Sequence, residues 1–540
     1  MRPIPRALTA VAGLSLLAGA LGPVAAADPA PPDAPVTLPA TVPSLTSWEA
    51  ASGTWSMTSA TRVVGSEDLA RTRDLLASEL RAVTGEAVPT APQDPDAGDI
   101  SLSLDPDRLA ELGVEGYELR VSADGIAVTG ADARGVFYGT RTVGQMLRQQ
   151  RVLPAGSAVD VPRYAERGVT ACACQINIQG DWIDRLLTDM ADLKLNHLLL
   201  EMKLKSDRHP EANTWSYYTR ADVSRLVSRA RDLGIDVIPE INSPGHMGIW
   251  LENLPEYQLV DRDGRRHPEM LDLSNPRAVQ YYLDLVDEYD GVFTTRYWHM
   301  GADEYMIGTS PANFPALARW AEQTYGAGAT VNDAFIAFVN QVNAHVKARG
   351  KSLRMWNDGV VPTNVVSLDR DITVEFWYAS GVRADVLAGQ GYRVMNASDA
   401  LYWSRSATFY KMDSERLWNS DWDVGRFPGA GIDPGNPMVT GAKLSIWPDD
   451  SVYQTENEVE EEVSDSLRFV SQMTWAASHG GMDWAQFKGS VDAVGRNPLW
   501  DNVARRPVVP TPSPPPALTP SWGRARTGRA RIPRAPTPGR

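Results

Sequence analysis

Cysteine is almost absent from this chain. Only Cys172 and Cys174 occur among 540 residues, so no disulfide framework holds the fold together and its stability must come from packing. Side chains two apart on a regular strand point to the same face, and their Cα separation is near the upper limit for a disulfide, so two buried thiols are the expected state. A zinc site would need more cysteines or histidines nearby in the sequence, and none is close.

Long apolar runs are confined to the beginning of the chain. Arg2 and Arg6 precede a mostly apolar segment that ends in small residues at Ala25 and Ala27, which is the pattern of a secretory signal peptide cleaved near Ala27. The apolar core is too short for a membrane anchor, and no later segment has the length to span a bilayer. We therefore expect an exported, extracellular protein from which residues 1–27 are removed.

Positive charge is scarce in the body of the chain. The signal carries two arginines and the tail after residue 504 carries eight, with no acid in either, so residues 28–504 have a net charge of −25 against −15 for the whole sequence. An acidic body repels nucleic acid and anionic membranes, and neither is expected as a partner. The sequence does not indicate an oligomeric state.

The amino-terminal part reads as a small domain after a linker. Residues 28–43 are rich in proline and alanine and are expected to form a flexible lead-in. Residues 44–160 are predicted to form a small α+β domain, because helical patterns occur on both sides of two alternating strands, 117–122 and 125–130, that flank a turn. Its charged residues are scattered, which favours a structural role.

From Arg167 onward, strands alternate with helices, as in parallel βα units. Residues 161–504 are therefore predicted to form a catalytic (β/α)8 TIM barrel of the α/β class, whose chemistry lies at the carboxyl ends of the strands. The Pro/Arg-rich residues 505–540 lack apolar periodicity and are predicted to be a disordered tail. The eight candidate strands are 167–174, 196–202, 235–241, 296–301, 352–356, 372–378, 392–397 and 442–447.

Polar and aromatic residues gather at the predicted carboxyl ends of these strands. Carboxylates bind sugar hydroxyls and indole faces stack on the C–H faces of a sugar, so three tryptophans on three strands favour a sugar pocket over ordinary core packing. No glycine-rich phosphate loop occurs, and histidines with ligand spacing are too few to favour a metal, so no cofactor is expected. The residues are Glu240, Asn242, His246, His299, Asp303, Glu304, Trp356, Asp358, Trp377, Tyr402, Trp447 and Asp449.

Asp303 and Glu304 are adjacent acids that directly follow an apolar stretch. A surface pair would need no explanation, but the apolar approach indicates restricted exposure. In a retaining two-carboxylate glycosidase the carboxyl groups stand about 5 Å apart across one bond, whereas neighbours on a regular strand point to opposite faces. A third interpretation makes Glu304 the general acid and assigns Asp303 to the substrate's own acetamido group.

At these residues the chain resembles family 20 glycoside hydrolases, the β-N-acetylhexosaminidases. The strand-four signature H-x-G-x-D-E appears at residues 299–304, and "PEINSPGH" at 239–246 is similar to the family pattern P-E-I-D-x-P-G-H. "GYELRV" and "GVFYGTRTVGQML" resemble the small α+β domain that precedes the barrel in this family. The resemblance covers roughly residues 45–490, and its several ordered motifs make it specific.

The resemblance implies a TIM barrel and a retaining mechanism in which the substrate assists its own cleavage. Glu304 would protonate the glycosidic oxygen, the acetamido carbonyl would attack the anomeric carbon, and Asp303 would stabilise the oxazolinium through the amide N–H. Tyr402 would bind the amide oxygen. The other implied roles are an aromatic box of Trp356, Trp377 and Trp447, hydroxyl binding by Arg167 and Asp449, and support or substrate contact by Glu240, His246, His299 and Asp358.

The chain departs from the family pattern at positions that contact sugar hydroxyls. Cys172 and Gln175 stand where the family usually has an acid and a second arginine, Asn242 replaces an aspartate, and Ser404 replaces an acid. Strand two ends in "LLLEMKLKSD" in place of a run rich in histidine and aspartate. The acid pair and the acetamido box are intact.

These observations give three functional hypotheses. The first is a secreted exo-β-N-acetylhexosaminidase that removes terminal β-linked GlcNAc or GalNAc from glycans or chitin fragments. The second is a related specificity, such as lacto-N-biosidase-like release of a disaccharide or action on a sulfated N-acetyl sugar. The third is a glycan-binding relative that has lost catalysis, against which the intact acid pair weighs.

Overall fold

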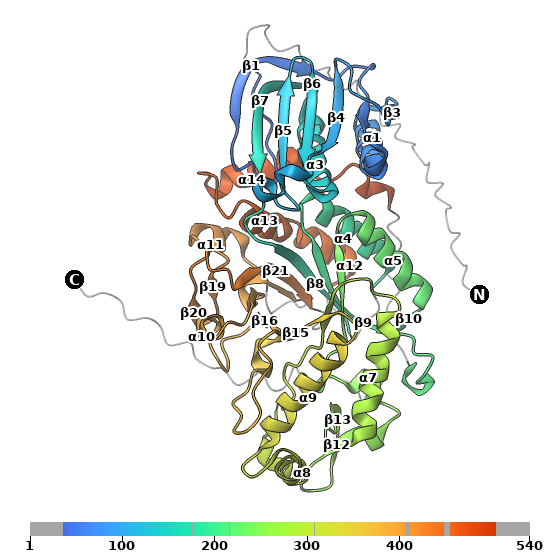
Figure 1. The fold of residues 1–540 in the computed structure, drawn as a ribbon, viewed down its shortest axis with the longest axis vertical. Coiled ribbons are helices and arrows are strands. Elements are labelled where there is room, and N and C mark those ends of the chain that lie inside the picture. The colour runs from blue at the N-terminus through green and yellow to red at the C-terminus, as the bar shows by residue number, and fades with distance from the viewer. Residues whose placement is uncertain are drawn as a thin grey trace, which may run out of the picture.

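The computed structural model describes residues 36–174, 178–214, 217–306, 308–404, 411–447 and 454–503. The predicted signal peptide, the tail 505–540, Gln175 and Asp449 lie outside the described residues. Among the residues that are described, no helix combines the length and apolarity needed to cross a bilayer. Figure 1 shows two stacked domains, with the first, in blue and cyan, at the top.

The amino-terminal domain is a mixed seven-stranded sheet in the order β1-β7-β5-β6-β4-β2-β3. The predicted strands 117–122 and 125–130 form the antiparallel pair β5 and β6, and the helices α1 and α3 pack against each other beside the sheet. The elements are β1 (Glu49–Ser56), β2 (Val63–Gly65), α1 (Ala70–Thr84), β3 (Thr90–Ala91), β4 (Asp99–Leu104), α2 (Leu109–Leu112), β5 (Tyr117–Ser122), β6 (Gly125–Gly130), α3 (Ala133–Gln149) and β7 (Val152–Asp160).

Residues 36–43 pack against α3, although they were expected to belong to a flexible lead-in. The side-chain amide of Gln145 accepts the N–H of Val42 and donates to its carbonyl, both at 2.8 Å. Gln149 makes the matching pair with Ala40 at 3.2 and 2.7 Å. Composition predicted flexibility because it does not reveal that two glutamines four apart share one helix face.

The second domain is a closed barrel of eight parallel strands, which confirms the predicted fold class. β21 pairs with β8 and β8 pairs with β9, closing the ring. All eight predicted strands are present. They are β8 (Glu166–Ala173), β9 (His197–Leu204), β11 (Asp236–Glu240), β14 (Tyr297–His299), β15 (Ser352–Trp356), β16 (Thr373–Phe376), β17 (Val394–Asn396) and β21 (Val439–Trp447).

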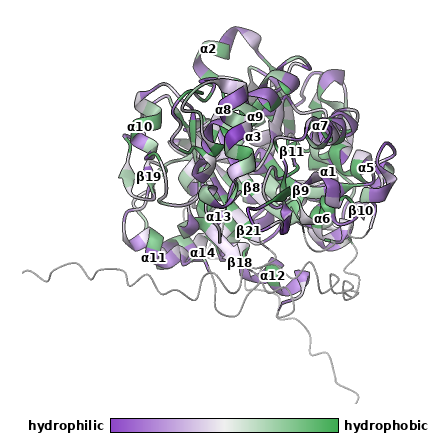
Figure 2. Ribbon diagram, turned by 90° about the horizontal axis from the view of Figure 1, so that it is seen from below, coloured by the Kyte–Doolittle hydropathy of each residue, from purple (hydrophilic) through white to green (hydrophobic). Residues whose placement is uncertain are grey.

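Helices surround the barrel strands, and Figure 2 shows hydrophilic ribbon mainly at the periphery. The helix α9 illustrates the cause: Thr330 and Asp333 form a capping box at its start, and apolar residues at helical spacing are buried along one side. The helices are α4 (Gly180–Asp192), α5 (Arg220–Asp232), α6 (Gly248–Leu251), α7 (Pro276–Asp290), α8 (Pro315–Tyr325), α9 (Val331–Lys347), α10 (Ala384–Gly389), α11 (Ser414–Asn419), α12 (Glu456–Glu462), α13 (Ser464–Trp475) and α14 (Trp484–Val494).

Short strands extend the sheet at the carboxyl end of the barrel or form separate hairpins. β10 (Tyr217–Tyr218) pairs with the end of β9. Tyr402 lies beyond the seventh barrel strand, on a separate one: β17 ends at Asn396, a 3-10 turn follows, and Tyr402 begins β18 (Tyr402–Ser404), which pairs with β21. The hairpins are β12 (Gln258–Val260) with β13 (Arg266–Leu271) and β19 (Arg426–Phe427) with β20 (Ala430–Gly431).

Cys172 and Cys174 form a disulfide, so the prediction of two free thiols is wrong. Their Cα atoms are 5.2 Å apart, which is well inside the range of bridged cysteines. The prediction assumed a regular strand through both residues. β8 instead ends at Ala173 and the chain bends at Cys174, which shortens the separation.

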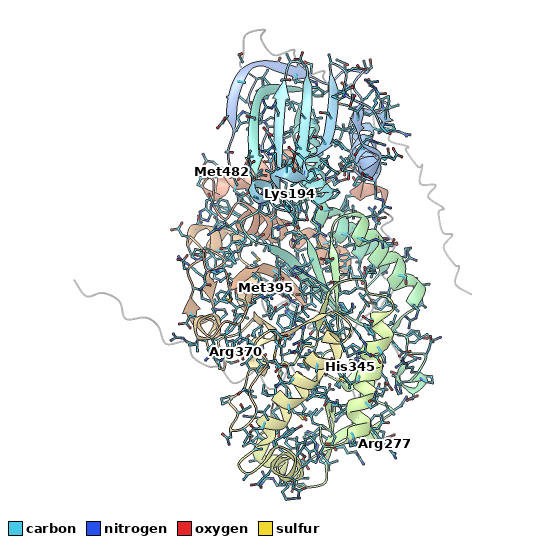
Figure 3. All side chains as sticks on the ribbon, in the orientation of Figure 1. Lys194, Arg277, His345, Arg370, Met395 and Met482 are labelled. Carbon is cyan, nitrogen blue, oxygen red and sulfur yellow. A yellow bond between two sulfur atoms is a disulfide. The ribbon has the colours of Figure 1, made fainter. Side chains whose placement is uncertain are left out.

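The two domains meet across buried charges at the amino ends of the barrel strands. Lys194, labelled at this junction in Figure 3, is 1% exposed. Its Nζ lies 3.1 Å from Asp160 and donates to the hydroxyl of Tyr117 at 2.8 Å. Burial opposes ionisation of Asp160, but the charge of Lys194 and several hydrogen bonds outweigh it and lower the pKa of Asp160. The small domain therefore leaves the carboxyl ends of the strands uncovered.

Candidate active site

The predicted strand-end residues converge at the carboxyl end of the barrel. Trp356, Trp377 and Tyr402 belong to one buried cluster, and Trp447 packs against it. Trp356 and Trp447 are the last residues of β15 and β21, and Trp377 directly follows β16. A cluster drawn from several different strands is the usual construction of an active site in this fold.

Both carboxylates of the acid pair face His246. The Nε2 of His246 is 3.4 Å from Oδ2 of Asp303 and 3.5 Å from Oε2 of Glu304. β14 ends at His299, and left-handed backbone at Ala302 (φ 70°) and Glu304 (φ 54°) turns both acids to the same side. The expectation of opposite faces does not hold, because it assumed that the strand continues through the pair.

Gly301 allows this turn to lie against Asn242. Its φ is 71°, and a Cβ at this position would lie 2.0 Å from Oδ1 of Asn242. The Nδ2 of Asn242 donates to Oδ1 of Asp303 at 2.7 Å. The sequence placed Asn242 among the polar strand-end residues and marked it as a departure from the family pattern, and the structure gives it contact with a predicted catalytic carboxylate.

The pKa values of Asp303 and His246 move in opposite directions. Burial disfavours ionisation of Asp303, but the charge of His246 and the hydrogen bonds from His246 and Asn242 outweigh burial and lower the pKa of Asp303. Burial also disfavours protonation of His246, yet the two carboxylates raise its pKa well above 6.5. Both shifts favour the charged forms, a carboxylate and an imidazolium, and an ionised Asp303 can accept a hydrogen bond from a substrate amide.

Asp358 lies behind the acid pair. Its Oδ2 accepts the backbone N–H of Glu304 at 2.9 Å, and its Oδ1 accepts the indole N–H of Trp377 at 2.8 Å. Burial, together with the nearby charge of Asp303, raises the pKa of Asp358 to about 7. The predicted supporting residue thus contacts both the acid turn and the aromatic pocket.

Glu240 and His299 are fully buried beneath Trp356. The indole N–H of Trp356 donates to Oε1 of Glu240 at 3.0 Å, and Nδ1 of His299 lies 3.4 Å from the same oxygen. His299 also accepts the N–H of Gly301 at 3.1 Å. Since neither side chain is exposed, both support the pocket from below.

The four predicted aromatic residues contact one another around the pocket. The rings of Trp377 and Tyr402 are parallel within 5°, with centroids 6.1 Å apart. Trp447 is tilted against both Trp356 at 5.8 Å and Tyr402 at 5.5 Å. Tyr402 reaches this position because β18 pairs with the end of β21.

Arg167 does not reach the site, so the prediction that it binds sugar hydroxyls is wrong. It is fully buried near the amino end of β8, the opposite end from the acid pair. Its guanidinium donates to the carbonyls of Tyr164 and Lys194 at 2.8 and 2.9 Å and lies 2.8 Å from Glu115 of the small domain. The arginine begins the strand, whereas the chemistry of a barrel occurs where strands end.

Glu201 on β9 is a further carboxylate of the site that sequence reasoning missed. Its Oε2 lies 3.2 Å from the Sγ of Cys172. Burial, followed by the charges of Glu240 and Asp303, raises the pKa of Glu201 well above its usual value. The signal was present in the sequence as one acid within the otherwise apolar run "HLLLEM".

Two groups of residues in the described chain offer three metal-ligand atoms within 4.8 Å of one another. The first is Cys172, Cys174 and Glu201, in which the two sulfurs are bonded to each other. The second is His246, Asp303 and Glu304, which is the acid site itself. Neither group provides a donor set separate from the disulfide and the acid pair.

Models of known protein families match most of the described chain. The catalytic domain of glycosyl hydrolase family 20 matches residues 164–462, and domain 2 of the same family matches residues 38–161. The chain belongs to glycosyl hydrolase family 20. The order of the two matches is the order of the two domains in the structure.

Two named relatives resemble this family 20 chain to different degrees. Lacto-N-biosidase of Bifidobacterium bifidum is 56% identical over 468 residues, which is 86% of this chain and 42% of that protein. Beta-hexosaminidase subunit A1 of Dictyostelium discoideum is 24% identical over 362 residues, or 63% of this chain and 66% of the relative. The matched region thus spans less than two thirds of either relative.

Solved structures of family 20 enzymes share the fold. Streptomyces plicatus N-acetyl-beta-hexosaminidase, in complex with Thio-NAglucal, has a TM-score of 0.69 and 21% identity, covering 89% of this chain and 99% of that one. An exo beta-N-acetylglucosaminidase from Vibrio harveyi has a TM-score of 0.69 and 18% identity, covering 88% and 80%. At these identities the similarity shows the architecture alone.

Proposed function

We propose that this family 20 glycosyl hydrolase is a retaining enzyme that cleaves the bond following a β-linked N-acetylhexosamine, with the substrate's acetamido group as nucleophile. The observation that carries the proposal is the shared contact of His246 with Asp303 and Glu304. Because Asp303 is held ionised by His246 and Asn242, it is suited to orient and stabilise an amide. The four aromatic rings beside it supply walls for that group.

In the first step, Glu304 gives its proton to the glycosidic oxygen as the bond from that oxygen to C1 breaks. The acetamido carbonyl oxygen attacks C1 and closes an oxazolinium ring, while Asp303 accepts the amide N–H. Tyr402 donates to the amide oxygen, and Trp356, Trp377 and Trp447 enclose the group. Water then adds to C1 and passes a proton to Glu304 as the ring opens, and two inversions retain the β configuration.

For the substrate, we propose a disaccharide end group, lacto-N-biose, in which galactose is β1,3-linked to N-acetylglucosamine. Support comes from the identity of 56% to a lacto-N-biosidase over 86% of this chain. At two positions that depart from the family pattern, the side chains are engaged within the protein. Cys172 is held in a disulfide, and Asn242 is directed to Asp303.

A second candidate is an exo-β-N-acetylhexosaminidase that releases single GlcNAc or GalNAc residues. The sequence similarity to beta-hexosaminidase subunit A1 of Dictyostelium discoideum, 24% identical over 362 residues, favours it. The acid pair and the aromatic box serve this reaction equally well. The two candidates therefore differ only in what the pocket accepts beyond the N-acetylated sugar.

Three aryl glycosides compared side by side test the proposal: the β-lacto-N-bioside, the β-N-acetylglucosaminide and the plain β-glucoside. We expect kcat/KM to be at least about 100-fold higher for the first than for the second, because groups built to bind a missing sugar would be left unpaired. Preference for the second would favour the exo-hexosaminidase. Hydrolysis of the glucoside at a similar rate would defeat assistance by the substrate, and binding without turnover would indicate a glycan-binding relative.

We further propose that the enzyme acts outside the cell, because residues 1–27 carry the signal-peptide pattern. The expected mature protein begins near Asp28. Expression with the native leader, followed by sequencing of the protein recovered from the medium, tests this. Retention of the whole protein inside the cells would contradict it.

A further inference from the structure

The turn that follows β15 lies between the acid pair and Trp377. It is a single 3-10 turn, Asn357–Gly359. The two carboxylate oxygens of Asp358 accept one N–H each, from the backbone of Glu304 at 2.9 Å and from the indole of Trp377 at 2.8 Å. One planar group therefore joins the predicted proton donor to a wall of the acetamido pocket.

The two residues beside Asp358 strengthen this connection. The side chain of Asn357 accepts the backbone N–H of Trp377 at 2.9 Å and donates to the carbonyl of Tyr378 at 2.9 Å. A Cβ on Gly359 would lie 2.2 Å from the carbonyl oxygen of Ala302, so a glycine is needed for the turn to approach the acid loop this closely. Asn357, Asp358 and Gly359 thus contact the backbone of both the acid turn after β14 and the segment after β16.

We propose that Asp358 is a positioning residue that sets the place of Glu304 relative to Trp377. This inference rests on the proposed function. In that reaction the acetamido group against Trp377 attacks C1 while Glu304 protonates the oxygen that leaves C1. The attack forms a bond to C1, and the proton goes to the oxygen bonded to C1. A displacement of about 1 Å between Glu304 and the acetamido group can therefore cost about 100-fold in rate.

The first arm of the test is Asp358→Asn, measured on the aryl glycoside that the wild-type enzyme cleaves best. The oxygen of the substituted asparagine can accept one N–H, but its NH₂ group faces the other N–H donor. One of the two hydrogen bonds of Asp358 is therefore lost. We expect kcat to fall about 10- to 100-fold, with KM changed less than about threefold because both carboxylate oxygens of Asp358 already accept hydrogen bonds from the protein.

The second arm places the same change in a Trp377→Phe background. Phenylalanine keeps an aromatic wall but has no indole N–H, so the asparagine can satisfy Glu304 with its oxygen and meets no second donor. If Asp358 acts through Trp377, Asp358→Asn should cost less than about threefold in this background, which is a strong departure from additivity.

Asp333→Asn is the matched control for a purely structural effect. Asp333 is fully buried, whereas Asp358 is half-buried, and like Asp358 it holds a loop by accepting backbone N–H groups, those of Val365 and Val366 at 2.6 and 2.8 Å. Because it caps α9 outside the site, its replacement should lower the melting temperature while kcat and KM of the folded enzyme stay unchanged.

Several outcomes would overturn the inference. Equal factors for Asp358→Asn in the wild-type and Trp377→Phe backgrounds would exclude coupling through the indole. A loss of activity explained wholly by loss of folded protein, as expected for Asp333→Asn, would reduce Asp358 to a structural residue. Unchanged kcat in an active enzyme would defeat the positioning role alone, whereas a wild-type enzyme inactive on every N-acetylated glycoside would defeat the proposed function as well.

Discussion

Buried charges lie at both ends of the barrel, but they are balanced in different ways. At the junction with the small domain, each basic group faces a carboxylate. The pairs are Lys194 with Asp160, Arg167 with Glu115, Arg148 with Asp192 and Arg141 with Glu79. At the carboxyl ends of the strands, carboxylates gather around His246 and His299. They are Glu201, Glu240, Asp303, Glu304 and Asp358.

The difference separates charges that hold the fold from charges that are available for chemistry. At the junction the partner outweighs burial, so the pKa of Asp160 and of Glu115 is lowered. In the site, neither Glu201 nor Asp358 forms an ion pair within the described chain, and the pKa of each is raised. A protein tolerates such groups at a cost in stability where function needs them.

The largest expected effect comes from removing the proposed proton donor. Glu304→Gln should lower kcat/KM about 10²- to 10⁴-fold, because general acid catalysis contributes that much. Glu304→Gln should cost little stability, because it removes one carboxylate from a cluster that is rich in acids. Kinetics on the preferred aryl glycoside and urea unfolding of the same samples measure both, and retention of activity within about tenfold of wild type would refute the role of Glu304.

Removing a charge at the junction between the domains should lower the stability and leave the activity of the folded enzyme unchanged. Lys194→Met leaves Asp160 buried without its cation and should cost about 3–5 kcal/mol of unfolding free energy, with kcat of the folded enzyme unchanged. Lys488→Met is the matched control, because Lys488 pairs with Asp492 on the surface and should cost less than about 1 kcal/mol. Similar losses in the two variants, measured by urea unfolding, would remove the distinction between junction and surface.

Gly301→Ala tests the close approach of the acid turn to Asn242. The added Cβ would overlap Oδ1 of Asn242, so we expect a loss of about 2 kcal/mol or more, accompanied by a fall in kcat because Asn242 holds Asp303. Gly350 has a similar φ of 74° with no atom within 4 Å of its Cβ position. Gly350→Ala should therefore cost only about 1–2 kcal/mol from backbone strain and leave kcat unaltered. Equal losses of stability and equal kcat in the two variants would mean that the protein relieves the overlap between the new Cβ and Asn242.

The smallest effect is expected for Glu201→Gln and depends on pH. The folded pKa of Glu201 lies above its unfolded value, so the folded state binds the proton more tightly and wild-type stability falls as pH rises above the unfolded pKa. Glutamine resembles the protonated acid and avoids this loss. We expect the stability of the variant relative to wild type, measured by urea unfolding, to rise as the pH is raised above the unfolded pKa. A fall of the variant relative to wild type would show that Glu201 is ionised when folded.

Much of the fold followed from local patterns in the sequence. The eight barrel strands were recognisable because apolar runs of strand length alternate with helical periodicity, and both depend on neighbouring residues only. The helices α1 and α3 and the hairpin of β5 and β6 were recognisable for the same reason. The packing of residues 36–43 was not, because it depends on Gln145 and Gln149, which lie more than a hundred residues away.

The candidate site shows where local patterns stop being informative. The acid pair, His246 and the tryptophans could be named from motifs, but the direction of Asp303 and Glu304 could not, because it is set by a left-handed turn after the strand has ended. Arg167 was misplaced because the family resemblance was given more weight than its position at the start of β8, away from the carboxyl end where the chemistry of a barrel lies. The place of Glu201 in the site and the contact of Asn242 with Asp303 could be recognised only from the tertiary structure.

By itself, the sequence determined that this chain builds a family 20 barrel, and it predicted a proton donor, an amide-binding acid and an aromatic box at the ends of the strands. These features are carried by residue identity and spacing, which are properties of the chain. The tertiary structure alone decided which buried charges are paired, how the two cysteines meet and which turn connects Glu304 with Trp377. Those outcomes arise from contacts between distant segments, and the energy of such contacts exists only once the barrel has closed.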